Sequence, residues 1–201
     1  ENFSSINLSN DANVYYQKDS DYYVEVQAQQ NVLDVMKVDK SGSEICIGFK
    51  NLINIIKHDP ISVIIHSPKF DGANVSGTGL VKVINYFESN SMNFNVSGSG
   101  EIRVDHISTS SLEATISGSG KITVYQGQSN SVNAKISGSG KADLQNVESQ
   151  SVSTNTSGSG TTKVWALETL NVTISGSGDV YYKGSPSLNS HISGSGKLIK
   201  L

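Results

Sequence analysis

The stretch LEATISGSGKITV, residues 112–124, decides the fold of this chain of 201 residues. Its centre, Ser-Gly-Ser-Gly, occurs seven times, once with Thr in place of the second Ser. The copies begin at Ser76, Ser97, Ser117, Ser137, Ser157, Ser175 and Ser193. The steps between them are 18 to 21 residues, and a nearly fixed period of this length is typical of stacked supersecondary units.

Apolar and polar residues alternate along this stretch without a break, which predicts strands on both sides of the motif. Leu112, Ala114 and Ile116 face one side before the motif, and Ile122 and Val124 face the same side after it. The two glycines fall on this core side, where the lack of a side chain permits a sharp bend. Each motif is therefore expected to be a corner between two sheets. Contacts between residues one period apart make the sheets parallel, and parallel crossovers are right-handed. We therefore predict an all-β, right-handed parallel β-helix (a solenoid) with rungs of 18–21 residues.

The segment between the two strands of a rung adds a third apolar column to the expected core. We place it at Phe87, Ile107, Val147 and Leu167. Threonines occupy core positions at Thr154, Thr156 and Thr162, so the core is expected to be weakest in that rung.

The first 70 residues lack the motif. Strands are expected over residues 12–16, 22–28, 44–49 and 61–66, with a hairpin turn at 40–43 and a short helix that begins at Asn31 as its cap. Repeat proteins need ends that protect the terminal core and the terminal strand edge. We therefore expect one domain over residues 1–201, with irregular capping rungs in residues 1–70 and seven motif rungs in residues 71–201.

Composition narrows the classes of function. The net charge is −3, and the 15 Lys and Arg residues are spread along the chain, whereas nucleic-acid binding needs a basic stripe. No apolar run approaches the roughly 20 residues of a membrane span. Residues 1–5 do not resemble a signal peptide, so we expect that none exists or that it was removed. Cys46, the single cysteine, is interpreted as a buried inert thiol, with a reactive or intermolecular thiol as the alternative.

The sequence offers little support for catalysis, so we predict a protein that is not an enzyme and has no catalytic residue, metal or cofactor. His58, His66, His106 and His191 lie in separate segments without the spacing of paired metal ligands, and His58 with Asp59 is interpreted as a surface pair. A carbohydrate-active β-helix enzyme would need clustered carboxylates that only the fold could bring together.

Two kinds of outward column are candidate binding features. The motif serines would stack at about 4.8 Å intervals, either bridging neighbouring rungs or forming a hydroxyl array for water, ice or sugar. Five residues after each motif, a second column contains Tyr125 and Trp165, with Tyr181 nearby. Exposed aromatic side chains on a rigid face can stack on sugar rings or anchor a protein. Tyr125, Trp165 and Tyr181 are therefore our candidate ligand-binding residues, with packing under adjacent loops as the alternative.

Several segments outside the motif carry a further signal: Phe3 with Ile6, residues 14–16, residues 22–26, residues 31–33, and Ile61, Val63 and Ile65. Together with the repeated Ile-Ser-Gly-Ser-Gly-Lys-Ile blocks, they resemble the head GIN domain family, described as putative auto-transporter adhesins. The resemblance covers nearly the whole chain. It implies a right-handed β-helix, export, and a location at the cell surface, on the outer membrane or in the periplasm of a Gram-negative bacterium, in many cases through a lipid anchor upstream. It supplies no catalytic residues.

We therefore expect a secreted or cell-surface binding or adhesion module whose rigid, repetitive polar face contacts host or envelope glycans or surface proteins. A structural spacer or assembly element of the cell envelope, with ends that pair head to tail, is the main alternative, and the carbohydrate-active enzyme comes after it. The ligand and the oligomeric state stay open.

Overall fold

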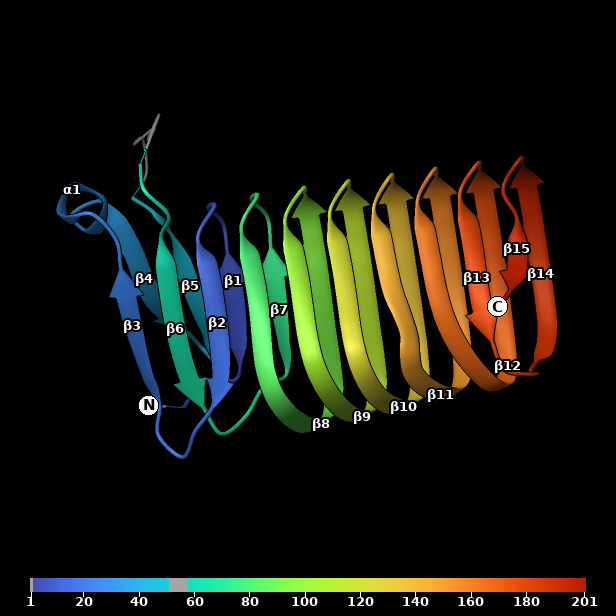
Figure 1. The fold of residues 1–201 in the computed structure, drawn as a ribbon, viewed down its shortest axis with the longest axis horizontal. Coiled ribbons are helices and arrows are strands. Elements are labelled where there is room, and N and C mark those ends of the chain that lie inside the picture. Colours follow the sequence, from blue (N-terminus) through green and yellow to red (C-terminus); the bar gives the residue numbers. More distant parts are fainter. Residues whose placement is uncertain (1, 51–57) are drawn as a thin grey trace.

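The computed structural model describes residues 2–50 and 58–201 and shows stacked parallel coils, as the repeat predicts (Figure 1). Five long strands form the regular part, and each runs down one sheet, bends, and returns up the opposite sheet. They are β8 (Leu80–Gly98), β9 (Glu101–Gly118), β10 (Lys121–Gly138), β11 (Lys141–Gly158) and β12 (Thr161–Gly176). β13 (Asp179–Lys183) and β14 (Ser187–Gly194) form the last complete coil, and β15 (Leu198–Lys200) begins a further one by pairing with β13.

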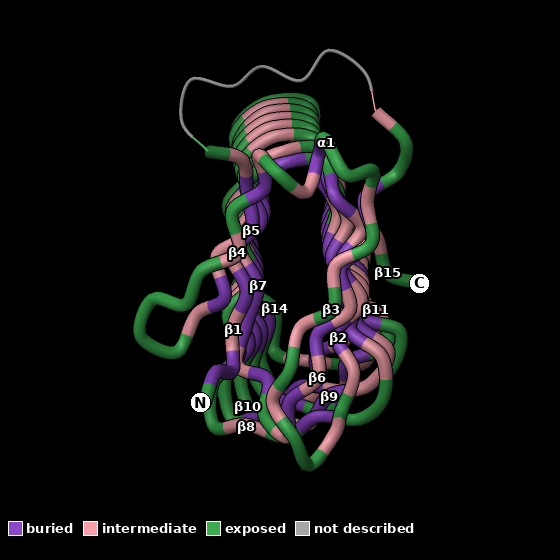
Figure 2. The backbone as a smooth tube through the Cα atoms, turned by 90° about the vertical axis from the view of Figure 1, so that its left-hand side faces the viewer, coloured by how far each residue is buried: buried purple, intermediate pink, exposed green. Residues whose placement is uncertain are grey.

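Equivalent residues of successive coils are hydrogen-bonded neighbours. Ile122 pairs with Ile102 on one side and with Ala142 on the other, and Ile136 pairs with Ile116. From β8 to β12, the side chains that alternate toward the interior are almost completely buried. Two walls therefore enclose one continuous apolar core, which Figure 2 shows as buried residues along both walls.

The Ser-Gly-Ser-Gly motifs are corners between the two sheets, as predicted, but their glycines have two different roles. Gly118 is half-buried and has a φ of +124°, a conformation that a side chain disfavours. Gly120 is buried, and a Cβ atom there would lie 2.7 Å from the carbonyl oxygen of Gly100. The prediction that both glycines lie on the core side was therefore right only for the second. Backbone bonds tie the corners together, because Ser119 N donates to Gly98 O at 2.9 Å.

The N-terminal part contains the expected strands. Its elements are β1 (Ser5–Leu8), β2 (Asn13–Lys18), β3 (Tyr23–Gln27), α1 (Gln30–Leu33), β4 (Met36–Ser41), β5 (Glu44–Phe49), β6 (Ser62–Ser67) and β7 (Gly72–Val75). β4 and β5 form an antiparallel hairpin, and β3 and β6, which are distant in sequence, form a second antiparallel pair. The turn expected at residues 40–43 joins β4 to β5 through Gly42, with a φ of +60°. The helix begins two residues earlier than predicted, with Gln29 rather than Asn31 at its cap.

The order of the first coils in space differs from their order in sequence. β1 lies between β5 and β7, and β2 lies between β6 and β8. The coil of β5 and β6 therefore stacks outside the earlier coil of β1 and β2. β4 and β3 then pair antiparallel with β5 and β6 and form the outer edges (Figure 1).

Three core expectations have different outcomes. Phe87, Ile107 and Val147 are fully buried, but Leu167 is only half-buried, because the shorter β12 shifts register and buries Ala166 instead. The threonines are indeed in the core, and the Oγ1 atoms of Thr156 and Thr162 lie 3.3 Å apart. Cys46 is half-buried on the outward face of β5, not in the core. Burial raises the pKa of its thiol, which keeps the thiolate scarce.

Candidate binding surface

We call the turn in the middle of each long strand, where it passes from one sheet to the other, the lower bend. Side chains are exposed there at positions where strict alternation predicts burial. Tyr125 and Gln126 are consecutive and both exposed, and the next residue, Gly127, is buried. The break occurs because the bend inserts an apolar plug into the core. Phe87 and Ile107 are plug residues, in register with Gly127.

Immediately before the plug, Tyr86, His106 and Gln126 form an in-register column across three coils. Tyr86 is 38% exposed, and its ring meets the His106 ring edge-on, with centroids 4.7 Å apart. The ammonium group of Lys18 lies 5.5 Å from the Tyr86 ring centroid and donates to the Tyr86 carbonyl at 3.2 Å. The column therefore offers an aromatic ring, an imidazole and an amide side by side.

This column borders an open hollow of about 480 Å³. Its lining residues are Tyr86, His106, Ile107, Ser108, Gln126 and Gln128. A second hollow of about 180 Å³ shares two of them and is lined by Ser108, Thr109, Gln128, Ser129, Asn130, Glu148 and Gln150. We call the two hollows together the bend groove. It combines one aromatic ring with many amide and hydroxyl groups, which suits an uncharged polyhydroxylated ligand.

An asparagine shapes the backbone directly before Tyr86 of the bend groove. Asn85 has a φ of +80°, which asparagine tolerates better than most residues, and the register shifts between Val83 and Tyr86. The Asn85 side-chain oxygen accepts the backbone N–H of Lys18 at 3.3 Å. The extra residue in this coil thus presents the Tyr86 ring to solvent.

The three aromatic residues predicted from the sequence lie on or near the same side, but they do not form one site. Tyr125 is 50% exposed, next to Gln126 of the groove. Trp165 is half-buried with the Lys183 ammonium 5.8 Å from its ring centroid, and Tyr181 is half-buried with Lys163 at the same distance. Trp165 and Tyr181 are therefore partly covered by lysines.

The expected common column of Tyr125 and Trp165 does not form. A register shift between β11 and β12 places Trp165 opposite Glu148 rather than Gln145. Tyr86, His106 and Gln126 were missed because we assumed an unbroken alternation. The signal was present, since each of them directly precedes a position of the third apolar column or its glycine.

The motif serines face solvent, as predicted, but do not bridge the rungs. Within the described residues, no motif hydroxyl makes a hydrogen bond, and the corners are joined by backbone groups. Their hydroxyl groups are consequently available to water.

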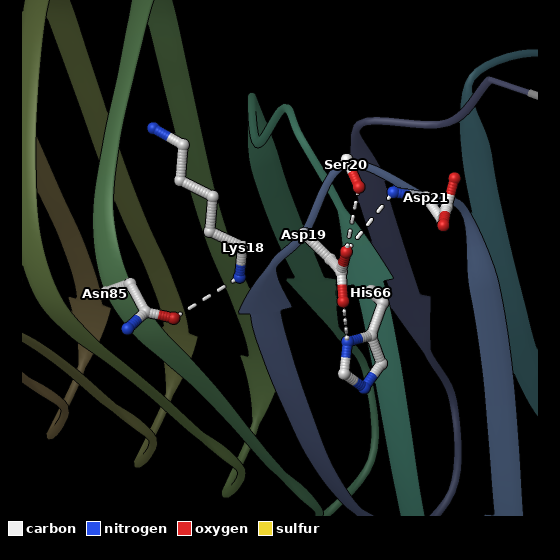
Figure 3. Close-up of polar contacts among 6 residues, drawn as sticks. All are labelled: Lys18, Asp19, Ser20, Asp21, His66 and Asn85. Atoms are coloured by element: carbon white, nitrogen blue, oxygen red, sulfur yellow. Dashed lines mark hydrogen bonds and ion pairs between the residues drawn. The ribbon is translucent and has the colours of Figure 1, made fainter.

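The most elaborate polar cluster outside the groove fastens the turn between β2 and β3 (Figure 3). One carboxylate oxygen of Asp19 accepts from the Asp21 N–H and from the Ser20 hydroxyl, and the other lies 3.1 Å from His66 Nδ1. The Asp21 N–H holds the pKa of Asp19 below its usual range. Tyr23 stacks on His66 with centroids 4.0 Å apart. Ser20 donates to the carboxylate and not to the imidazole, so this is a turn clasp rather than a catalytic array.

The other acidic and imidazole groups are also dispersed. His58 Nε2 lies 3.1 Å from the Asp11 carboxylate, and its Nδ1 lies 2.6 Å from the backbone oxygen of Asp59, so His58 contacts Asp59 through the backbone and Asp11 through the side chain. Over residues 2–50 and 58–201, no group of three or more His, Cys, Asp or Glu side chains could hold a metal ion. The same residues contain no helix long and apolar enough to span a membrane.

The fold and the polar groove define the class as a β-solenoid with an outward-facing polar surface. The chain belongs to the family described as "putative auto-transporter adhesin, head GIN domain", whose model matches residues 2–186. No protein with a curated description matches the sequence.

Several solved structures share the fold. A putative adhesin from Bacteroides fragilis superposes with a TM-score of 0.91 at 18% identity, covering 100% of this chain and 93% of that one. A putative adhesin from Parabacteroides distasonis gives 0.81 at 22% identity with the same coverage. A putative lipid binding protein from Parabacteroides distasonis gives 0.78 at 22% identity, again covering 100% and 93%. At these identities the likeness establishes the fold.

Proposed function

We propose that this protein is an exported, non-enzymatic adhesion module that binds neutral glycans of the host or the cell envelope in the bend groove. The observation that carries the proposal is the hollow of about 480 Å³ in which Tyr86, His106 and Gln126 lie in register. Membership of an adhesin family supports a location at the cell surface or in the periplasm.

The mechanism we propose is stacking combined with hydrogen bonding. A sugar ring lies against the exposed Tyr86 face, and the Gln126 and Gln128 amides, which both donate and accept, read its hydroxyl groups. Coils about 4.8 Å apart repeat such contacts along the groove, so a chain of several sugars would gain contacts from coil to coil. Several copies on one cell surface would further strengthen weak binding through effective concentration.

A glycan and extracellular-matrix array with the 201-residue protein tests the proposal. Tyr86→Ala and Gln126→Ala should weaken binding up to about tenfold each, because an aromatic contact or a hydrogen bond contributes about 1 kcal/mol. Asn155→Ala is the matched control, because Asn155 is an exposed amide on the opposite sheet. An array without hits, or hits that both groove variants leave unchanged, would contradict the proposal.

The three aromatic residues predicted from the sequence belong in the same experiment. Tyr125→Ala should affect binding if the ligand extends beyond the groove, because Tyr125 adjoins Gln126 and is half exposed. Trp165→Ala and Tyr181→Ala should change binding less, since neither side chain lines the bend groove.

A further inference from the structure

The two ends of the solenoid have edge strands of different chemistry (Figure 1). At the N-terminal end, the edge strand β4 carries Lys37, Asp39 and Lys40, and Lys37 pairs with Asp39 at 3.0 Å. The other edge strand, β3, carries Glu25. Charges on edge strands oppose pairing with another chain. This end is therefore protected against association.

The C-terminal end lacks this protection. β14 pairs only with β12, and β15 pairs only with β13, among the described residues. β14 has the sequence SLNSHISG, which contains no Lys, Arg, Asp or Glu. Leu188 is 45% exposed and Ile192 is 40% exposed, although they continue the core columns of Leu170 and Ile174. An uncharged edge with an open apolar face is a template for strand addition.

We propose that this end binds the same end of a second copy, so that the protein forms a tail-to-tail dimer with two-fold symmetry. A two-fold axis perpendicular to the sheets reverses the strand direction, and β14 then pairs antiparallel with β14 of the second copy. With Ser190 opposite Ser190, Leu188 lies opposite Ile192 of the second copy. The interior side chains of both copies then stay on one side and merge the two cores.

The same axis serves both sheets. Ser190 stands three residues before the corner Ser193–Gly196, and Ile199 stands three residues after it. An axis through Ser190 therefore also passes near Ile199, and β15 meets β15 of the second copy. Lys200, the charged residue of β15, donates a hydrogen bond to the Ser185 hydroxyl at 3.3 Å.

Polarity decides between a tail-to-tail and a head-to-tail arrangement. Head-to-tail assembly would place the apolar edge of β14 against β4, where Lys37, Asp39 and Lys40 would lose water. Tail-to-tail assembly matches apolar residues with apolar residues and His191 with Asn189 of the second copy, and it closes after two copies. The charged N-terminal edges then cover both ends of the dimer.

Light scattering and disulfide capture test this inference. We expect light scattering to give the 201-residue protein twice the monomer mass of 21.4 kDa at about 100 μM. The double variant Leu188→Lys with Ile192→Lys should have the mass of a monomer, because the dimer would bury its added charges. Tyr125→Lys adds a lysine at another exposed hydrophobic residue, far from β14, and should leave the dimer intact.

Ser190→Cys gives the second readout, in a Cys46→Ser background that removes the native thiol. Directly opposed residues of an antiparallel pair have Cα atoms roughly 4.5–5.5 Å apart, within disulfide range, so mild oxidation should cross-link the copies. Asn171→Cys, one coil inward, should not cross-link. A monomer at about 100 μM, an open series of larger oligomers, or a dimer that Ser190→Cys cannot cross-link would each overturn the proposal.

Discussion

Each coil turns twice, and the two turns are built on opposite principles. The upper corner, formed by the Ser-Gly-Ser-Gly motif, repeats the same small residues, and from Gly98 onward the first glycine of each motif has a φ between +112° and +139°. The lower bend has a different sequence in every coil, a buried plug that ranges from Phe87 to Gly127, and register shifts in β8 and β12. Repetition therefore marks where the backbone dictates the residue, and variation marks where the surface is free to acquire a ligand.

The largest effect should come from the plug of the lower bend. Phe87 is 1% exposed and packs against Tyr16 and Phe70, with ring centroids 5.7 and 5.6 Å apart. Phe87→Ala should lower the free energy of unfolding by about 3–5 kcal/mol, measured by thermal unfolding. Its neighbour Tyr86 is the matched control, since Tyr86→Ala should cost at most about 1 kcal/mol while weakening ligand binding. Equal losses in the two variants would contradict the division between plug and groove.

The upper corner should respond strongly to a single methyl group. Gly118→Ala places a Cβ atom in a positive-φ conformation and 2.7 Å from the Gly98 carbonyl oxygen, so we expect a loss of about 3 kcal/mol. Ser117→Ala removes an exposed hydroxyl of the same corner and should stay within about 0.5 kcal/mol. Calorimetry of both variants measures the contrast. A costly Ser117→Ala would show that the serine ladder stabilises the corners.

The contrast between the turns also explains what could be read from the sequence. The corner was predictable because only glycine fits it and because seven copies fix the period. The bend was not, because residues as different as Phe87 and Gly127 occupy one plug position and conceal its register. Tyr125 was found from alternation, whereas Tyr86 was missed because two consecutive exposed residues break that alternation.

The order of the N-terminal coils was equally hidden from the sequence. β5 and β6 stack outside β1 and β2, and this pairing joins residues 39 or 49 positions apart, for example Ser5 with Glu44 and Asn13 with Ser62. No repeat links those segments, so only long-range packing decides their order. The individual strands and the turn at Gly42 were predictable because their signals are local.

In the strands between the two turns, two buried threonines should respond to the same substitution with small stability changes of opposite sign. Thr154 is 1% exposed, and its Oγ1 atom has no hydrogen-bond partner, so Thr154→Val should raise stability by about 1 kcal/mol. Thr156→Val is the matched control, because it leaves the Thr162 hydroxyl without its partner and should lower stability by about 1 kcal/mol. Urea unfolding of the two variants measures the signs. Two changes in the same direction would mean that these threonines act through packing alone.

The smallest effect concerns the charges that follow the upper corner. Arg103 Nη2 lies 2.6 Å from Glu101 Oε2, and Lys121 Nζ lies 3.5 Å from Oε1; chiefly the Arg103 hydrogen bond holds the pKa of Glu101 below its usual range. Because the pKa of Glu101 is lower in the folded than in the unfolded state, its ionised carboxylate stabilises the fold at pH values above the unfolded pKa near 4.5. This contribution is lost as the pH falls through the lower pKa of the folded state. Glu101→Gln should therefore cost about 0.5 kcal/mol at pH 7, and the difference should shrink toward pH 3.

Urea unfolding at both pH values separates this electrostatic contribution from packing, because a packing defect would persist in acid. Glu113→Gln breaks the exposed ion pair with Lys135 on the other sheet and serves as the control at pH 7, with a cost below about 0.5 kcal/mol. A loss for Glu101→Gln that stays constant down to pH 3 would assign this carboxylate to corner packing. The charges beside the corner would then stabilise the fold through packing. The lower bend would be the part of the coil whose surface residues can vary with little loss of stability.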